Sequence, residues 1–349
     1  MKASYFRYDL EFKQAAGTSR GVLHNKESWF IVLEQDHKKG IGECGILRGL
    51  SYDDRPDYEA KLQWTCANIH VGEAQLWEEL RDFPSIQFGV EMAFRSLNSA
   101  TPFDLFPSDF TQGIQQIPIN GLVWMGDIDF MKTQLNDKIA QGFRCVKLKI
   151  GALDFEKELD LLRQIRTHFS ADQIEIRLDA NCAFTAADAL AKLQQLAVYQ
   201  IHSIEQPLAI NQRQLLNELI QSSPIPIALD EELIGLTTLD SKRALMEKCT
   251  PDYLIFKPSF IGGIKGTLEW IELAHEFGIA WWITSALESN IGLNAIAQFT
   301  ATLPNSLPQG LGTGALYTNN FDSPLQVKQG YLSYNPTINW QVDVPNFLS

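Results

Sequence analysis

The 349-residue chain is short of positive charge, which excludes one large class of partner. Lys and Arg number 29 against 42 Asp and Glu, so the formal net charge is −13. A nucleic-acid partner is not expected, because phosphate contacts require a basic face. An anionic small molecule still fits such a chain where cations gather in one cleft, since the local field governs binding.

Long apolar runs and paired cysteines are also missing. No stretch of about 18 apolar residues occurs, so we expect no membrane partner. The first nine residues lack the basic-then-apolar order of a secretion signal, and we expect a cytoplasmic protein. The five cysteines are scattered without a Cys-x-x-Cys pair, which predicts neither a disulfide framework nor a zinc site.

The sequence is rich in residues that build a core. Hydrophobic residues make up 45% of the chain, including 20 Phe and 8 Trp, which is enough to bury a large interior. Within residues 1–110 we predict a small α+β domain. Its expected strands are 5–12, 29–35 and 40–45, and its expected helices are 58–68 and 88–97.

From residue 117 the pattern changes to short β-branched runs that alternate with amphipathic stretches, which is typical of parallel βαβ units. We predict an α/β fold with a (β/α) barrel over residues 111–325, and a tail over 326–349 that packs back on the N-terminal domain. The expected barrel strands are 117–122, 144–150, 174–179, 204–206, 225–230, 253–257, 280–284 and 309–312. The expected helices include 154–168, 186–199, 211–221, 266–277 and 293–303.

Charged residues interrupt the C-terminal ends of five successive predicted strands, where a buried strand favours Val, Ile or Leu. They recur 25 to 30 residues apart, close to one βα repeat. Barrel active sites are built at this face, so we expect these side chains to meet there. The residues are Lys147, Lys149, Asp179, Glu205, Asp230 and Lys257.

Three carboxylates that face one another repel unless a cation neutralises them, and an all-oxygen ligand set favours a hard ion such as Mg²⁺. Taken singly, each Asp at a strand end is more often a helix N-cap, and each Lys is usually solvated. The near-constant period of the whole set favours a metal site.

These motifs resemble those of the muconate-lactonising branch of the enolase superfamily. The matching motifs are Lys147-x-Lys149, Asp179-Ala180-Asn181, Glu205-Gln206-Pro207, Asp230-Glu231 and Lys257-Pro258-Ser259, and Gly40-Ile41-Gly42-Glu43-Cys44 is similar to part of that family's capping domain. The resemblance spans nearly the whole chain. It implies a modified TIM barrel with an N-terminal α+β capping domain.

The resemblance also implies how the site residues act. Asp179, Glu205 and Asp230 would bind Mg²⁺, with Mn²⁺ as an alternative. Lys149 would be the base, since a lysine base with Mg²⁺ is the established pattern of this superfamily. Lys257 would face the other side of a carboxylate substrate, and Lys147 would tune the base and contact the carboxylate.

The segment 284–292, Thr-Ser-Ala-Leu-Glu-Ser-Asn-Ile-Gly, is similar to the corresponding stretch of the o-succinylbenzoate synthases, as is the Gly-rich segment 309–314. Dipeptide epimerases usually carry Asp-x-Asp at the latter point, and no Asp occurs here. The implied reaction is syn dehydration of 2-succinyl-6-hydroxy-2,4-cyclohexadiene-1-carboxylate to o-succinylbenzoate, a hydro-lyase step of menaquinone biosynthesis. An N-acylamino acid racemase, a dipeptide epimerase, and a silent barrel that binds an anionic metabolite remain alternatives.

Further residues are expected around this site. Arg20, Ser285, Ser289 and Gly312 are predicted to bind the substrate, and Asn181 and Glu231 to support the metal ligands. For several of them a structural role competes: Arg20 as an exposed loop residue, a Ser as a helix N-cap, and Asn181 in a local turn. The expected partner is a small carboxylate, and a homo-oligomer is compatible with the sequence.

Overall fold

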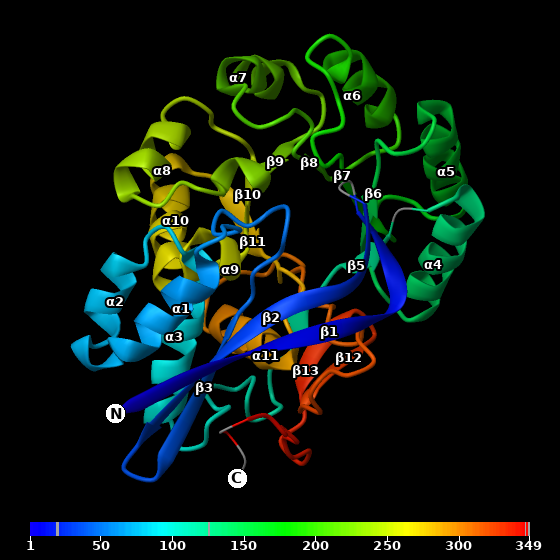
Figure 1. The fold of residues 1–349 in the computed structure, drawn as a ribbon. Helices are drawn as coiled ribbons and strands as arrows, with labels where there is room; N and C mark the ends of the chain where they lie inside the picture. The colour runs from blue at the N-terminus through cyan, green and yellow to red at the C-terminus, as the bar shows by residue number, and fades with distance from the viewer. Residues whose placement is uncertain (19–20, 125, 346, 348–349) are drawn as a thin grey trace.

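An antiparallel three-stranded sheet packed against helices forms the N-terminal cap in the computed structural model, which describes residues 1–18, 21–124, 126–345 and 347 (Figure 1). Its strands are β1 (Lys2–Thr18), β2 (Gly21–Gln35) and β3 (Lys38–Cys44), and its helices are α1 (Tyr58–Ala67), η1 (Ile69–Val71), α2 (Glu73–Glu79) and α3 (Pro84–Asn98). The predicted α+β arrangement is confirmed. Strands β1 and β2 run further than predicted, because residues 13–15 of β1 and most of residues 21–25 of β2 are exposed and carry no apolar period.

Two glycines let helix α3 lie directly on strand β3. A Cβ atom at Gly42 would stand 1.9 Å from the carbonyl oxygen of Gly89, and one at Gly40 would stand 2.4 Å from that of Ala93. A larger residue at either position would push the helix off the sheet. The Gly-x-Gly of the capping-domain motif therefore sets the distance between two backbones.

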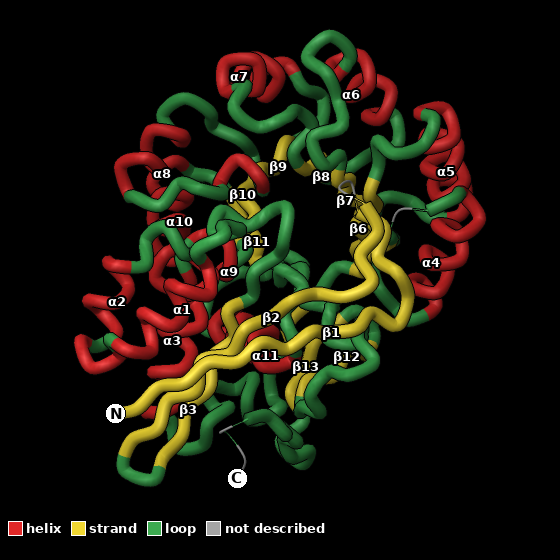
Figure 2. The backbone as a smooth tube through the Cα atoms, in the orientation of Figure 1, coloured by secondary structure: helices red, strands yellow, loops and turns green. Residues whose placement is uncertain are grey.

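Seven parallel strands curl into a barrel wall with helices on its outer side (Figure 2). The strands are β5 (Gly121–Val123), β6 (Cys145–Lys149), β7 (Glu175–Asp179), β8 (Ser203–Glu205), β9 (Ile227–Leu229), β10 (Tyr253–Phe256) and β11 (Ala280–Ile283). The helical elements are α4 (Ile128–Ala140), α5 (Phe155–His168), α6 (Ala189–Ala197), α7 (Arg213–Ser222), η2 (Glu231–Leu233), α8 (Leu239–Met246), α9 (Pro258–Ile261), α10 (Gly263–Phe277) and α11 (Asn290–Ala301). The predicted barrel fold is confirmed.

The two ends of the barrel sheet differ from the prediction. The expected eighth strand at 309–312 is reduced to two isolated parallel bridges, Gln309 with Ile119 and Gly310 with Thr284, which join the segment to both edges of the wall. The expected first strand at 117–122 divides into β4 (Ile117–Pro118) and β5, because Pro118 has no N–H to donate to a continuous ladder.

The C-terminal segment adds a second small sheet. Strands β12 (Leu325–Lys328) and β13 (Tyr331–Tyr334) form a hairpin, and β13 pairs with β4. Further along, Trp340 stacks on Phe103 with ring centroids 4.3 Å apart. The division into residues 1–110, 111–325 and 326–349 stays a prediction.

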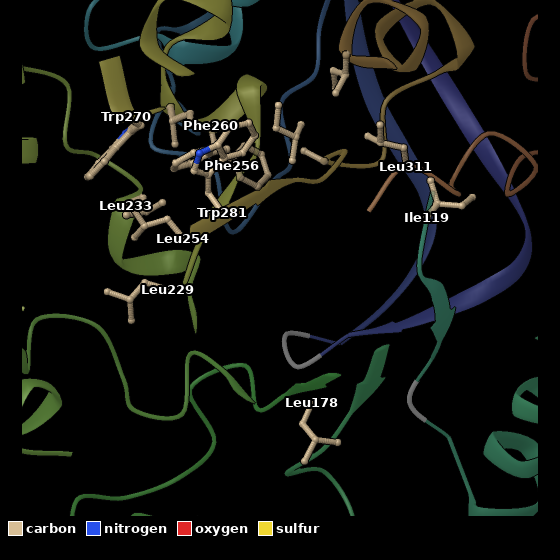
Figure 3. Packing of buried hydrophobic residues seen from close by; sticks show 14 of the residues in the cluster. Ile119, Leu178, Leu229, Leu233, Leu254, Phe256, Phe260, Trp270, Trp281 and Leu311 are labelled. Carbon is tan, nitrogen blue, oxygen red and sulfur yellow. The ribbon is translucent and has the colours of Figure 1, made fainter. Parts of the chain in front are cut away.

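One hydrophobic core runs through both parts of the molecule. Figure 3 shows Leu178, Leu229 and Leu254, on β7, β9 and β10, in a buried cluster. Phe30 and Ile41 of the cap belong to the same cluster. Each such side chain contributes about 1.5 to 3 kcal/mol by leaving water. The cap is thus fixed on the barrel by apolar packing. Among the described residues, no helix has the length and apolar character needed to cross a membrane.

Candidate active site

The charged residues predicted at the strand ends converge at one end of the barrel. Lys147 and Lys149 lie on β6, and Asp179 and Glu205 end β7 and β8. The parallel register pairs Lys149 with Asp179 and Asp179 with Glu205, so these positions stand at one level. Asp230 and Lys257 directly follow β9 and β10.

Short ion pairs join these side chains into two groups. Lys147 Nζ lies 3.0 Å from Asp179 Oδ2 and 2.5 Å from Glu205 Oε2. Lys149 Nζ lies 2.9 Å from the same Asp179 oxygen. Lys257 Nζ pairs with Asp230 Oδ2. The three carboxylates are almost fully buried, and each lies next to at least one amine.

The environment separates the carboxylates by their affinity for a proton. Burial raises the pKa of Glu205 to about 8, and the negative charge of Asp179 adds to the effect. Burial acts in the same direction on Asp179, but Lys147 and Lys149 outweigh it and hold that pKa well below its usual range. Asp179 is therefore the ionised partner of the lysines, whereas Glu205 lacks enough positive charge around it.

The lysines show the opposite balance. Burial disfavours the ammonium of Lys147, yet Asp179 and Glu205 outweigh burial and raise its pKa above the ordinary lysine value. Burial likewise opposes the charge on Lys257, and Asp230 followed by Glu205 raises its pKa. Both amines are positively charged at neutral pH, which suits a contact with an anionic substrate.

The carboxylates fit a divalent cation. Oxygen atoms of Glu205, Asp230 and Glu231 lie within 4.8 Å of one another. Glu205 Oε1 is buried and accepts no hydrogen bond from the described part of the chain, so this oxygen is available as a ligand. Hard cations such as Mg²⁺ take carboxylate oxygens of this kind. The geometry groups Glu231 with two predicted ligands, while Asp179 is held by the two lysines of β6.

Strained backbone turns the chain at the ends of β7 and β8. Asn181 has φ 43°, Cys182 φ 65° and Gln206 φ 40°, all in the left-handed region that costs a non-Gly residue free energy. The Asn181 side chain donates to Asp179 Oδ1 at 2.6 Å from Nδ2 and accepts from Lys149 Nζ at 2.6 Å. The structure places Asn181 in contact with Asp179 and Lys149, and its support of a metal ligand stays a prediction.

The lysines open onto a pocket with polar and apolar walls. Lys147, Lys149 and Lys257 line it together with Asp179 and Glu231. The other lining residues include Leu47, Leu50, Asn120, Trp124, Asn181, Phe260, Thr284, Ser285, Ala286, Leu287, Gly312, Thr313 and Leu316. Leu47 and Leu50 follow β3, so the cap supplies part of the apolar wall.

Sequence reasoning missed several of these lining residues. Leu47 and Leu50 lie in an irregular segment that carries no period, and their only signal was that leucine is unusual in an exposed loop. Asn120 lies between β4 and β5, inside the expected first strand, and Thr313 directly follows the expected eighth strand. Neither residue carries a charge that interrupts an apolar run, so no pattern singled them out. Thr313 is joined to Ser285 by a 2.6 Å hydrogen bond between their hydroxyl groups.

The predicted substrate contacts have different outcomes. Ser285 and Gly312 line the pocket. Ser289 does not belong to the lining in the described part of the chain: it is fully buried, caps α11 by accepting from Ile291 N at 3.1 Å, and donates its hydroxyl to Glu43. The N-cap alternative therefore replaces its predicted substrate contact. Arg20 lies outside the described residues.

Comparison with known proteins gives two family matches. Residues 1–97 match the family described as "MenC, N-terminal domain", and residues 131–337 match "Enolase C-terminal domain-like". The o-succinylbenzoate synthase of Desulfotalea psychrophila is 44% identical over 95% of this chain and 98% of its own length. That of Vibrio cholerae is 27% identical over 92% of both chains.

Solved structures agree with the sequence matches. The crystal structure of MenC from Desulfotalea psychrophila superposes with a TM-score of 0.85 at 41% identity, covering 95% of this chain and 99% of that one. Muconate lactonizing enzyme from Pseudomonas fluorescens, complexed with muconolactone, gives a TM-score of 0.83 at 22% identity over 98% of this chain and 96% of that one. The second likeness shows the shared fold.

Proposed function

Because the chain belongs to the o-succinylbenzoate synthase family of the enolase superfamily, we propose that it catalyses the Mg²⁺-dependent syn dehydration of 2-succinyl-6-hydroxy-2,4-cyclohexadiene-1-carboxylate to o-succinylbenzoate, in menaquinone biosynthesis. The observation that carries the proposal is that Lys149 and Lys257 line one pocket beside a buried group of carboxylates. Binding alone does not require such a pair of amines.

Lys149 is the proposed base. Its Nζ is held by Asp179 and Asn181, and it lines the pocket where a ring carbon next to a carboxylate can be presented. A lysine base acts as the neutral amine, which neighbouring positive charge favours. Lys147 carries such a charge on the same face of β6, and it also offers an ion pair to the substrate carboxylate. Asp179 beside Lys149 acts in the opposite direction, and a cation bound by Asp179 would offset that negative charge.

Asp179, Glu205 and Asp230 would hold the Mg²⁺, with Glu231 beside them, and the cation would neutralise negative charge that develops on the substrate carboxylate. A carbon acid beside a carboxylate is very weak. Charge stabilisation that appears only in the transition state therefore lowers the barrier without tightening ground-state binding.

Lys257 approaches from the far side of the barrel. It follows β10, which stands four positions from β6 in the curled sheet. Its ammonium is the proposed electrostatic partner of the ring as the π system develops. Lys149 removes the ring proton, hydroxide leaves from the same face, and the proton on Lys149 returns to it to give water. The apolar walls exclude bulk solvent from this exchange.

The direct test is product formation followed by ultraviolet absorption, with purified cyclohexadiene substrate and Mg²⁺. Wild type is expected to turn over, and Lys149→Ala and Lys257→Ala are expected to lose nearly all activity while remaining folded by circular dichroism. Normal turnover in Lys149→Ala would refute its role as the base. Exchange of the α-proton of N-acylamino acids or dipeptides with solvent deuterium, without dehydration, would instead support a racemase or epimerase.

A further inference from the structure

A buried charged network joins the cap to the barrel behind the pocket wall. Lys26 Nζ, on β2, donates to Ser28 Oγ at 3.0 Å, and Ser28 Oγ donates to Glu43 Oε1 at 2.7 Å. Glu43, on β3, accepts from the backbone N–H groups of Ser289 and Gly292, both at 2.9 Å. A cap carboxylate thus binds the first turn of barrel helix α11, where an anion is favoured.

Next to this network, Glu288 ties together two segments of the active site. Its Oε1 accepts from Ser259 Oγ at 2.5 Å, and its Oε2 accepts from Ala286 N at 2.6 Å. Ser259 stands two residues after Lys257, in the single turn of α9. Ala286 itself lines the pocket beside Ser285. One carboxylate therefore fixes the segment that carries Lys257 relative to the neighbouring pocket segment that follows β11.

The cap supplies the charge that this carboxylate needs. Glu288 has no exposed surface, and burial raises its pKa, while Lys26 is the leading influence in the opposite direction. Burial lowers the pKa of Lys26, which Glu43 and Glu288 counteract. A buried charge of either sign is costly without its partner, so Lys26 and Glu288 depend on each other although they belong to different domains.

The same region leaves little space for movement. A Cβ atom at Gly45, one residue beyond β3, would stand 2.6 Å from Ser259 Oγ and 3.0 Å from Glu288 Cγ. The cap backbone at Gly45 therefore lies against the hydrogen-bonded side chains of Ser259 and Glu288. A displacement of the cap at Gly45 toward the barrel would therefore meet Ser259, which stands two residues after Lys257.

We propose that Glu288 is a positioning residue for the reaction, which fixes Lys257 against the 284–287 wall and is completed by Lys26 of the docked cap. The inference rests on the proposed function. Misplacement of a catalytic group by about 1 Å costs on the order of a hundredfold in rate. Loss of Glu288 is therefore expected to act on kcat more than on KM.

The test compares Glu288→Ala with Glu288→Gln in the ultraviolet assay. Glu288→Ala is expected to lower kcat by about ten- to a hundredfold, with KM changed by less than about threefold. Glu288→Gln is expected to recover most of kcat, because its amide oxygen accepts from Ala286 N and its amide nitrogen donates to Ser259 Oγ. A purely structural role would not produce a loss confined to kcat and recovered by the isosteric amide.

Glu91→Ala is the matched control. Glu91 is a nearly buried cap carboxylate on α3 that accepts from Ile264 N at 2.6 Å and Lys265 N at 3.0 Å, and it does not line the pocket in the described part of the chain. This variant is expected to lower Tm and to keep kcat within about twofold. An equal loss of kcat in Glu91→Ala, or full kcat in Glu288→Ala, would overturn the positioning role alone. Absence of turnover in wild type would overturn the proposed function and this role with it.

A second pair of variants tests the network if Glu288→Ala does not fold. Lys26→Met leaves Glu43 and Glu288 without their buried counter-charge and is expected to lower both Tm and kcat. Adding Glu288→Gln removes one of the two buried carboxylate charges that Lys26→Met leaves without a partner. The double variant should therefore have a higher Tm and a higher kcat than Lys26→Met. A double variant no better than Lys26→Met would refute the coupling.

Discussion

Lys149 Nζ donates a 2.6 Å hydrogen bond to Oδ1 of Asn181, so the proposed base and a strained residue at the end of β7 form one unit. The left-handed backbone of Asn181 turns its amide back toward Asp179 and Lys149. The uncharged acceptor orients the amine without adding negative charge that would favour its protonated form.

Replacing Asn181 by Asp is therefore expected to impair the base through charge. The carboxylate would keep an acceptor near Lys149 but would add a negative charge beside an amine that must lose its proton to act. The kcat of Asn181→Asp should therefore be about tenfold lower than that of Asn181→Ala, which adds no charge. Steady-state kinetics of both variants measures the difference, and a kcat of Asn181→Asp equal to or above that of Asn181→Ala would contradict the role of Lys149 as base.

Variants of Lys257 distinguish two roles for this residue, stabilisation of the ring by its positive charge and transfer of a proton. If its ammonium acts only by its charge, Lys257→Arg should retain activity within about a hundredfold of wild type, whereas Lys257→Met should lose about a thousandfold or more. Steady-state kinetics at saturating Mg²⁺ measures both. An arginine variant as inactive as the methionine variant would indicate that Lys257 transfers a proton, as it would in a racemase.

Metal removal should abolish the reaction reversibly. Dialysis against a chelator is expected to eliminate turnover, and added Mg²⁺ to restore it.

Glu205→Gln should weaken Mg²⁺ binding at least tenfold, because it neutralises a buried ligand, and calorimetric titration with Mg²⁺ alone measures this without relying on activity. Glu175→Gln is the control, since Glu175 begins β7 at the other end of the barrel and pairs with Arg177. Equal affinity in wild type and Glu205→Gln would remove Glu205 from the site.

The strand-end residues were predictable because a parallel barrel imposes a repeat on the sequence. Asp179 and Glu205 fall in register on neighbouring strands, as their spacing indicated. The prediction of a full eighth strand was wrong, because Gln309 and Gly310 form only two isolated bridges to their neighbours. Short backbone pairings of this kind leave no periodic pattern to read.

Residues whose role depends on the docking of two domains could not be predicted in the same way. Nothing near Lys26 in the sequence indicates a partner such as Glu288, because their proximity arises only when the cap packs on the barrel. Ser289 was ambiguous for a related reason, because a serine before a helix suits both a helix N-cap and a ligand contact. Its burial and its hydrogen bond from Ile291 N identify it as the N-cap of α11. Long-range contacts, rather than local propensity, assign these residues.

Stability should depend on pH through Asp53 of the cap. Its Oδ2 accepts from Ser85 N at 2.9 Å and Ser85 Oγ at 2.6 Å in the first turn of α3, while its buried Oδ1 accepts no hydrogen bond from the described residues and can carry a proton. Burial raises the pKa of Asp53 from 3.8 to about 6. Between these two values the native state keeps a proton that the unfolded state has lost, so this contribution falls as pH rises through the window.

Comparison with Asp53→Asn isolates that contribution. The free energy of unfolding of wild type, measured relative to Asp53→Asn by urea denaturation, should fall by up to about 3 kcal/mol between pH 4 and pH 6.5. Above that range the difference should be constant. A difference that rises with pH across the window would show that the carboxylate is better stabilised in the folded protein than its burial implies.

Gly42 tests the contact between sheet and helix in the cap. Gly42→Ala places a methyl group 1.9 Å from the carbonyl oxygen of Gly89, so α3 must move away from β3. Overpacking of this kind lowers the free energy of unfolding by about 1 to 3 kcal/mol. The loss at Gly42 should lie at the upper end of this range, because the nearest atoms belong to the backbone of α3 and cannot turn away as a side chain can. Gly49→Ala is the control, since it has φ 80° but no atom within 4 Å of the added carbon, and it should lose only about 1 kcal/mol. Because Glu43 follows Gly42 and holds the start of α11, Gly42→Ala should also lower kcat in the fraction that remains folded, whereas Gly49→Ala should not.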